Sequence, residues 1–308
     1  MSADVPQVLR AATGLLAEAG VASPDTDAAA LLAHAWDIDS GALNRRRLFA
    51  DAVPAAVLTE FADLIGRRAS RVPLQHLTGR AAFRHLELLI GPGVFVPRPE
   101  TELLVTEVLQ DLARHAEKRG DENEGSADVH VPFVVDLCSG SGAITLSLAC
   151  EHPRLRALGV EREPAALEWS FTNLELAEVG DSVVDFVAGD ATTFADDHPE
   201  LCGSADAVVT NPPYVPDDAR PRDPEVADHD PAPALYGGAS GLEIPALIIA
   251  QAEKLLHPDG LFVMEHGEDQ GAGVRDLIAA TASLSGARTL PDYTGRDRFT
   301  VARRAVID

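Results

Sequence analysis

The feature that most constrains the fold is a regular alternation of short apolar runs and helical segments from Phe133 onward. The apolar runs cover 133–137, 155–160, 183–187, 205–210 and 261–265, and the helical segments 143–150, 164–177, 242–256 and 271–284. Strands that alternate with helices predict an α/β fold with a mostly parallel, doubly wound sheet. Two further runs, 288–290 and 298–302, have no helix between them and predict an antiparallel hairpin at the edge of a seven-stranded sheet.

Three regions are expected along the chain. Residues 1–72 have apolar side chains at helical spacing and predict a small helical domain. Residues 73–97 predict a linking β-hairpin, with strands over Phe83–Ile90 and Val94–Val96 and a turn at the Gly-Pro-Gly between them. Residues 98–308 form the α/β domain, in which the polar stretch 115–130 is expected to be a surface loop.

Charge and cysteine content narrow the possible partners. The chain has 49 acidic and 25 basic side chains, a net charge of −24 that would repel a phosphate backbone. Direct nucleic-acid binding is therefore not expected. Three cysteines without C-x-x-C spacing, an acidic start and no apolar run near the ~18 residues of a membrane helix predict a cytoplasmic protein without a membrane partner.

A glycine-rich loop follows the first strand of the α/β region. Asp136 is followed by Leu137 and then by the loop residues Cys138, Ser139, Gly140, Ser141 and Gly142, after which a helix begins. Glycines at such a turn let backbone N–H groups approach a ligand at the helix N-terminus. A dinucleotide-binding fingerprint would need a third glycine where Thr145 stands. Asp136 would repel a pyrophosphate but could orient an ammonium group, which favours a cofactor with an amino-acid moiety.

Two further acids follow the next two strands. Glu161 stands at the end of the second strand, where a carboxylate accepts hydrogen bonds from ribose hydroxyls. Asp190 and Ala191 follow the third strand, and the acid there could face an adenine amino group or simply stabilise a turn. Together with the glycine loop, these residues predict a nucleoside site.

The fourth strand ends in Asn211, Pro212, Pro213 and Tyr214. The prolines fix the backbone and remove two donors, so that carbonyl groups are presented outward. The Asn211 amide oxygen and the Pro212 carbonyl offer two acceptors, and Tyr214 offers a stacking face. This set suits a planar NH₂ group, and the three residues Asn211, Pro212 and Tyr214 are the candidate catalytic residues. No His or Cys spacing typical of a metal site is present.

With this tetrapeptide the chain resembles class I S-adenosylmethionine-dependent methyltransferases that act on amide or exocyclic amino nitrogens. More narrowly, it resembles the release factor glutamine methyltransferases (PrmC/HemK family). The segments that carry the resemblance are 73–79, 97–101, 234–242, 265–271 and 292–298, and the helical N-terminal domain also fits.

The resemblance implies N5-methylation of the glutamine in the Gly-Gly-Gln motif of peptide chain release factors. It also implies that the loop 138–142, Glu161, Asp190, Ala191 and Asn211 hold S-adenosylmethionine. Asn211–Tyr214 and Arg98 would bind the glutamine substrate, and residues 1–72 would recognise the release factor. Two departures stand out: the family often has Asp in place of Glu161 and a bulky residue in place of Ala191.

Two other functions remain open on the sequence. An adenine-N6 nucleic-acid methyltransferase would share the cofactor and the tetrapeptide, and a noncatalytic assembly factor could retain the same fold. The acidic, proline-rich stretch Val215–Pro233 is expected to be a solvated loop or a segment that orders on substrate docking.

Overall fold

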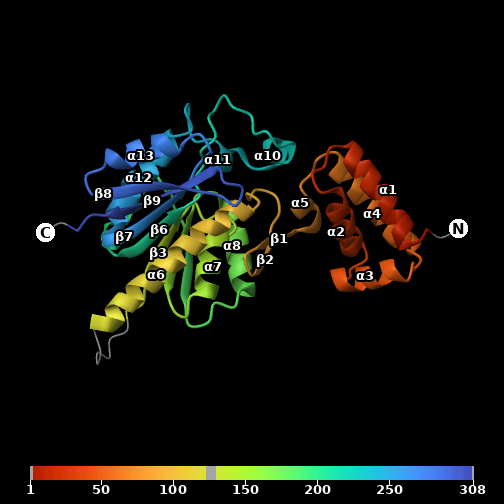
Figure 1. Cartoon of the computed structure of the whole chain (residues 1–308), viewed down its shortest axis with the longest axis horizontal. Coiled ribbons are helices and arrows are strands. Elements are labelled where there is room, and N and C mark those ends of the chain that lie inside the picture. Colours follow the sequence, from red (N-terminus) through yellow and green to blue (C-terminus); the bar gives the residue numbers. More distant parts are fainter. Residues whose placement is uncertain (1–2, 123–129, 307–308) are drawn as a thin grey trace. The chain divides into compact units, whose positions relative to one another are not determined.

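The computed structural model of the protein describes residues 3–122 and 130–306 (Figure 1). The described chain divides into two compact units. One contains the residues up to Arg80 together with Pro221–His229, and the other contains Ala81–Arg220 together with the residues from Asp230 onward.

The first unit is a bundle of helices. Its apolar core includes Leu16, Leu31 and Leu32, all fully buried. The first helix begins at a capping box, in which the Asp4 carboxylate accepts from the backbone N–H of Gln7 at 2.8 Å. The helices are α1 (Val5–Glu18), α2 (Pro24–Ala35), α3 (Ser40–Leu48), α4 (Ala55–Ala69), α5 (Leu74–Thr78) and α10 (Pro224–His229).

Ion pairs hold α10 in the helical unit, although the rest of its neighbourhood in the sequence belongs to the α/β unit. Glu225 accepts from Arg71 Nη2 at 2.6 Å and from Arg68 Nη1 at 2.9 Å. Arg68 is buried and also donates to Asp27 at 2.7 Å. Burial opposes the charge of Glu225, but the hydrogen bonds from Arg71 and Arg68 lower its pKa to about 2.

The second unit is built on a seven-stranded sheet in the order β5-β4-β3-β6-β7-β9-β8. The strands β3 to β7 are parallel, and β9 runs antiparallel to both β7 and β8. The sequence prediction of a mostly parallel sheet with an antiparallel edge hairpin is confirmed. The strands are β3 (Phe133–Leu137), β4 (Arg156–Glu161), β5 (Val183–Ala188), β6 (Ala205–Thr210), β7 (Leu256–Glu265), β8 (Leu284–Pro291) and β9 (Asp297–Arg304).

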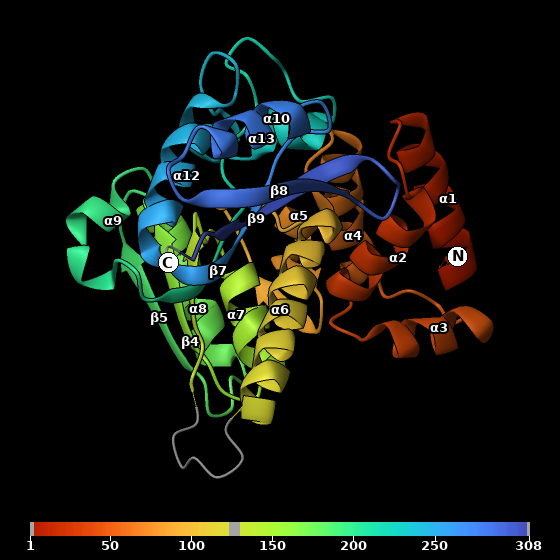
Figure 2. The ribbon, with the colours of Figure 1, turned by 60° about the vertical axis from the view of Figure 1, so that its left-hand side comes forward.

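Helices cover both faces of this sheet (Figure 2). On one face, α6 (Glu102–Glu122), α7 (Ala143–Glu151) and α8 (Pro164–Leu176) enclose one apolar core. On the other face, α9 (Phe194–Asp197), α12 (Glu243–Leu255) and α13 (Gly271–Ala279) enclose a second. The central strands β3 and β6 are buried along their whole length because both faces are covered.

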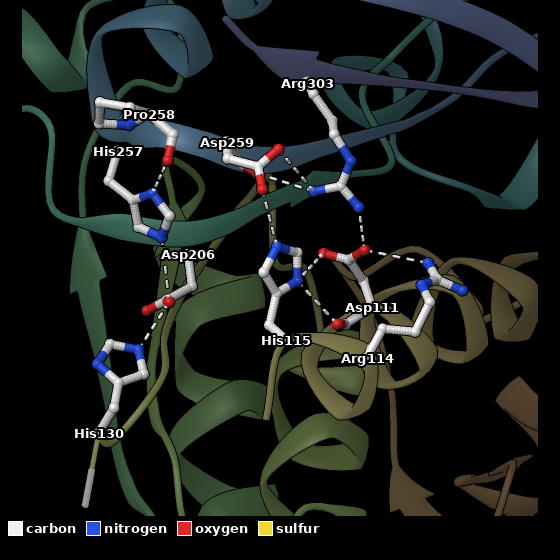
Figure 3. A network of polar contacts seen from close by, with 9 residues as sticks. All are labelled: Asp111, Arg114, His115, His130, Asp206, His257, Pro258, Asp259 and Arg303. Carbon is white, nitrogen blue, oxygen red and sulfur yellow. Dashed lines mark hydrogen bonds and ion pairs between the residues drawn. The ribbon is translucent and has the colours of Figure 1, made fainter. Parts of the chain in front are cut away.

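A polar network holds the amino-terminal end of the sheet (Figure 3). Asp206 Oδ1 lies 2.7 Å from His130 Nε2 and 3.1 Å from His257 Nε2, and Asp206 Oδ2 accepts from the backbone N–H of Phe133 at 2.8 Å. Burial opposes the charge of Asp206, but these hydrogen bonds hold its pKa below the usual range. Asp206 therefore joins the starts of β3, β6 and β7.

Similar contacts join α6 to β7 and β9 (Figure 3). Asp111 is almost fully buried and accepts from Arg303 and, at 3.0 Å, from Arg114 Nη2. His115 Nε2 lies 3.1 Å from Asp259 Oδ2. These charged side chains lie at the end of the sheet opposite the carboxyl ends of its parallel strands.

Three sequence predictions about local structure need correction. The hairpin is shorter than expected, with β1 (Arg80–Phe83) and β2 (Leu86–Leu89), and 94–96 is not a strand. Val94 and Val96 are apolar because they are fully buried in a core, not because they pair in a sheet.

The stretch 115–130 is not a loop from its start, because α6 continues to Glu122; residues 123–129 lie outside the described ranges. The expected loop 215–233 contains α10 and the beginning of α11 (Ala232–Leu235).

Candidate active site

The predicted site residues gather at the carboxyl ends of adjacent parallel strands. Leu137 pairs with Val160 in β4 and with Thr210 in β6, and Thr210 in turn pairs with Met264 in β7. The residues that follow these partners are therefore neighbours: Glu161, Cys138, Asn211 and Glu265, in spatial order. The strand order reverses between β3 and β6, the position where open α/β sheets bind their ligands.

The glycine-rich loop has the backbone that its sequence requires. Cys138, Gly140 and Gly142 all adopt left-handed conformations, with φ of 68°, 57° and 83°. An added Cβ at Gly140 would meet no atom of the chain within 4 Å, whereas one at Gly142 would lie 2.7 Å from Phe186 Cζ. Gly140 thus faces open space, and Gly142 is required for packing.

Asp136 is a buried acid with an unused acceptor. Its Oδ2 accepts from the Thr145 hydroxyl at 2.6 Å and the Thr145 N–H at 3.2 Å, while Oδ1 has no hydrogen-bond partner. Burial raises the pKa of Asp136 to about 7 against these hydrogen bonds. A bound ammonium group would satisfy Oδ1 and compensate the buried charge, so the residues present fit a cofactor with an amino-acid moiety.

Glu161 supports the loop directly. Its Oε2 accepts from the Gly140 N–H and its Oε1 from the Glu163 N–H, both at 2.8 Å. Each carboxylate oxygen has a second lone-pair site, so these bonds leave acceptor capacity for ribose hydroxyls.

Asp190 and Ala191 occupy a turn after β5. Asp190 Oδ1 accepts from the N–H and hydroxyl of Thr192, at 2.9 and 2.7 Å. Ala191 is buried in the apolar core. These contacts explain Asp190 as a turn residue, and adenine binding by either residue stays a prediction.

The tetrapeptide is fixed at both ends. Asn211 Nδ2 donates to the Thr101 hydroxyl at 3.2 Å, and the Tyr214 hydroxyl donates to Glu265 Oε1 at 3.2 Å. The Pro213 carbonyl lies so close to Gly237 that an added Cβ there would be 2.4 Å from it. The Asn211 and Tyr214 side chains are half-buried.

Arg98 is engaged with the chain itself. Its Nη2 donates to the fully buried Asp230 side chain at 2.6 Å, and its guanidinium lies over the Phe95 ring at 5.1 Å. This ion pair joins the start of η1 (Pro99–Thr101) to the segment before α11. Substrate binding by Arg98 remains a prediction.

Thr101 and Glu265 also contact the tetrapeptide, although neither is among the site residues predicted from the sequence. Glu265 could have been found, because it ends β7 in the strand next to β6. Both residues lie in segments that carry the family resemblance, 97–101 and 265–271, but only the fold brings Thr101 to the tetrapeptide. In the described ranges, no group of three or more His, Cys, Asp or Glu side chains could hold a metal ion, and no helix is both long and apolar enough to cross a bilayer.

Comparisons with known proteins agree with this geometry. Residues 7–79 match the family described as PrmC N-terminal domain, and 127–223 match the methyltransferase small domain. Among solved structures, the catalytic domain of hMettl16 aligns with a TM-score of 0.52 at 15% identity over 80% of this chain and 83% of that one, which shows the fold alone. Fold and site together define a methyltransferase with a Rossmann-like domain.

Full-length relatives narrow this class. The release factor glutamine methyltransferases of Mycolicibacterium smegmatis and Streptomyces coelicolor are each 42% identical to this chain over 96% of both proteins. A 4-amino-L-phenylalanine/4-methylamino-L-phenylalanine methyltransferase of Streptomyces pristinaespiralis is 36% identical over 92% of this chain and 90% of its own length. The chain belongs to the release factor glutamine methyltransferase family, and the resemblance stated from sequence is confirmed.

Proposed function

We propose that this chain methylates the side-chain amide nitrogen of the glutamine in the Gly-Gly-Gln motif of peptide chain release factors, with S-adenosylmethionine as the methyl donor. The observation that carries the proposal is the strand register, which sets Asn211–Tyr214 directly beside the glycine-rich loop in a chain of this family. A cofactor loop and an acceptor site for NH₂ thus share one edge of the sheet.

On this proposal the cofactor lies across the ends of β3, β4 and β5. Asp136 and the loop 138–142 hold its amino-acid end, and Glu161 accepts from its ribose. Asp190, Ala191 and Asn211 complete the cofactor site. When bound, S-adenosylmethionine would supply a methyl group that the amide nitrogen attacks without prior deprotonation, with the thioether as the leaving group and the extra amide proton lost after the transfer.

The tetrapeptide binds the methyl acceptor, which is the side-chain amide of the glutamine. A carboxamide nitrogen is a poor nucleophile because its lone pair is delocalised into the carbonyl. Asn211 Oδ1 and the Pro212 carbonyl accept hydrogen bonds from the two amide N–H groups, and Pro213 and Tyr214 fix the plane of the amide. Alignment of this kind contributes about 7–11 kcal/mol to a two-substrate reaction. The same two acceptors stabilise positive charge that develops on the nitrogen.

The partner is a release factor, which the helical domain would recognise, and the reaction would take place in the cytoplasm, where release factors act. The net charge of −24 supports a protein substrate over a nucleic acid.

A substrate panel with methyl-labelled S-adenosylmethionine tests the proposal. Purified release factor, 4-amino-L-phenylalanine, duplex DNA and ribosomal RNA would each be incubated with the protein. We expect label in the release factor only. Label in DNA or RNA would support the nucleic-acid alternative, label in the arylamine would favour the activity named for the Streptomyces pristinaespiralis relative, and cofactor binding without transfer would support a noncatalytic role.

A further inference from the structure

A buried carboxylate lies behind both ends of the tetrapeptide. The Glu265 side chain is 2% exposed. Its Oε2 accepts from the Thr101 hydroxyl at 2.6 Å, and its Oε1 accepts from the Tyr214 hydroxyl at 3.2 Å. Thr101 is 4% exposed and accepts from Asn211 Nδ2 at 3.2 Å. One carboxylate therefore reaches Asn211 through a hydroxyl and Tyr214 directly.

The direction of these hydrogen bonds decides which atom of Asn211 faces the substrate. A hydroxyl has a single proton, and Thr101 donates it to Glu265. The Thr101 oxygen can then only accept, so Asn211 must turn its NH₂ group toward Thr101. The Asn211 Oδ1 is consequently the atom left to accept from an incoming amide NH₂.

We propose that Glu265 is a positioning residue for methyl transfer, which acts through the Thr101 hydroxyl to hold the Asn211 amide in the acceptor orientation. The inference rests on the proposed function, since the orientation matters only for a substrate that presents NH₂. An ionised Glu265 accepts from both hydroxyls. A protonated Glu265 can donate to Thr101, which frees the Thr101 proton to attract Asn211 Oδ1 and turn the amide the wrong way.

The Glu265 carboxyl gains or loses its charge near neutral pH. Burial raises the pKa of Glu265 to about 7, against the Thr101 hydrogen bond, the Arg298 charge and the Tyr214 hydrogen bond; Glu100 raises it further. Arg298 is itself shared with Asp292 at 3.4 Å, and the neighbouring His266 ring is engaged with Thr300 and the Gly267 carbonyl. The ionised, productive form is therefore gained as the pH rises through about 7.

Kinetics and NMR test this inference together. In single-turnover methylation of a release factor, Glu265→Gln and Thr101→Val are expected to lower the rate by about 10²-fold, the scale of a small misplacement of a reacting group. Thr101→Ser, which keeps the hydroxyl, should retain the wild-type rate. The wild-type rate should rise with pH through about 7, and this increase should be absent from Glu265→Gln. Glu107→Gln, at a half-buried glutamate of α6 paired with the exposed Arg288, is the matched control and should keep both the rate and its pH dependence.

The NMR measurement does not depend on activity. The side-chain NH₂ signal of Asn211 should titrate with an apparent pKa near 7 in the wild type and not in Glu265→Gln or Thr101→Val. If the Asn211 signal of the wild type titrates but release factors stay unmethylated, the proposed function is overturned and the positioning role of Glu265 is kept. An Asn211 signal insensitive to pH, or a Glu265→Gln variant with the wild-type rate and pH profile, would overturn the positioning role of Glu265.

Discussion

At the residue scale, a substitution of Gly140 tests the proposed cofactor site. Its φ of 57° and the open space around it mean that Gly140→Ala costs backbone energy of about 1–2 kcal/mol but causes no clash within the chain. We expect the variant to fold and to lose at least about tenfold in S-adenosylmethionine affinity, because the new methyl group occupies the space in front of the loop. Calorimetric titration measures this.

Gly180 provides the matched control for that experiment. It also has a φ of 57° and no atom within 4 Å of an added Cβ, but it lies in the connection between α8 and β5. Gly180→Ala should lower the melting temperature as much as Gly140→Ala and leave the affinity unchanged. Equal affinities in the two variants would place the cofactor elsewhere.

Substitutions at the two ends of the tetrapeptide should have different effects on kcat and KM. On the proposed function, Asn211→Ala removes an acceptor that stabilises charge in the transition state, so kcat should fall by about 10²–10³-fold with little change in the KM for the release factor. Tyr214→Ala removes a stacking face that holds ground state and transition state alike, so KM should also rise. Steady-state kinetics with a release factor separates the two effects.

Tyr214→Phe serves as the control, because it keeps the ring and removes only the hydroxyl bonded to Glu265. Its KM should stay near the wild-type value. Near-normal turnover by Asn211→Ala would mean that the tetrapeptide does not have the role assigned to it.

At the element scale, Asp206 joins the starts of three strands, and its loss should appear as a pH-dependent loss of stability. Its pKa is lowered in the folded state, so the stabilisation is complete above the ordinary value near 4 and is lost as the pH falls below it. Asp206→Asn should reduce the free energy of unfolding by about 1–3 kcal/mol at pH 7 and by less below pH ~4. Denaturant titrations at several pH values measure this.

Asp185 is a suitable comparison, because it is an exposed aspartate of β5. Asp185→Asn should change stability by less than about 0.5 kcal/mol at every pH. A pH-independent cost of Asp206→Asn would show that shape, and not charge, is what this position contributes.

The sheet and the glycine-rich turn between β3 and α7 could be predicted from sequence because their signals are local. A buried strand, a glycine turn and the start of a helix directly follow one another in the chain. The Thr101–Asn211 and Thr101–Glu265 bonds span 110 and 164 residues, and no local pattern reports such contacts. The sequence does not predict the continuation of α6 past residue 115, because its Glu, Lys and Arg residues have the hydropathy of a loop, although they favour helix.

At the scale of the whole molecule, the segment after the tetrapeptide is divided between the two units. Residues 215–220 belong to the α/β unit, and 221–229 belong to the helical one through the ion pairs of Glu225. Glu225→Gln should speed hydrogen exchange at the backbone N–H groups of 222–229, with the S-adenosylmethionine affinity unchanged. The exposed Asp223 gives the control, since Asp223→Asn keeps the Arg71 and Arg68 bonds to Glu225. Equal exchange in both variants would mean that these ion pairs do not hold α10.

On the proposed function, the residues at this edge of the sheet direct methyl transfer to the amide nitrogen of one glutamine. Tandem mass spectrometry of a release factor, after reaction with deuterium-labelled S-adenosylmethionine, tests it most directly. We predict one labelled methyl group on the side-chain nitrogen of the Gly-Gly-Gln glutamine, formed by the wild type and nearly absent with Asn211→Ala. Label on another residue, or equal labelling by the two proteins, would contradict the account.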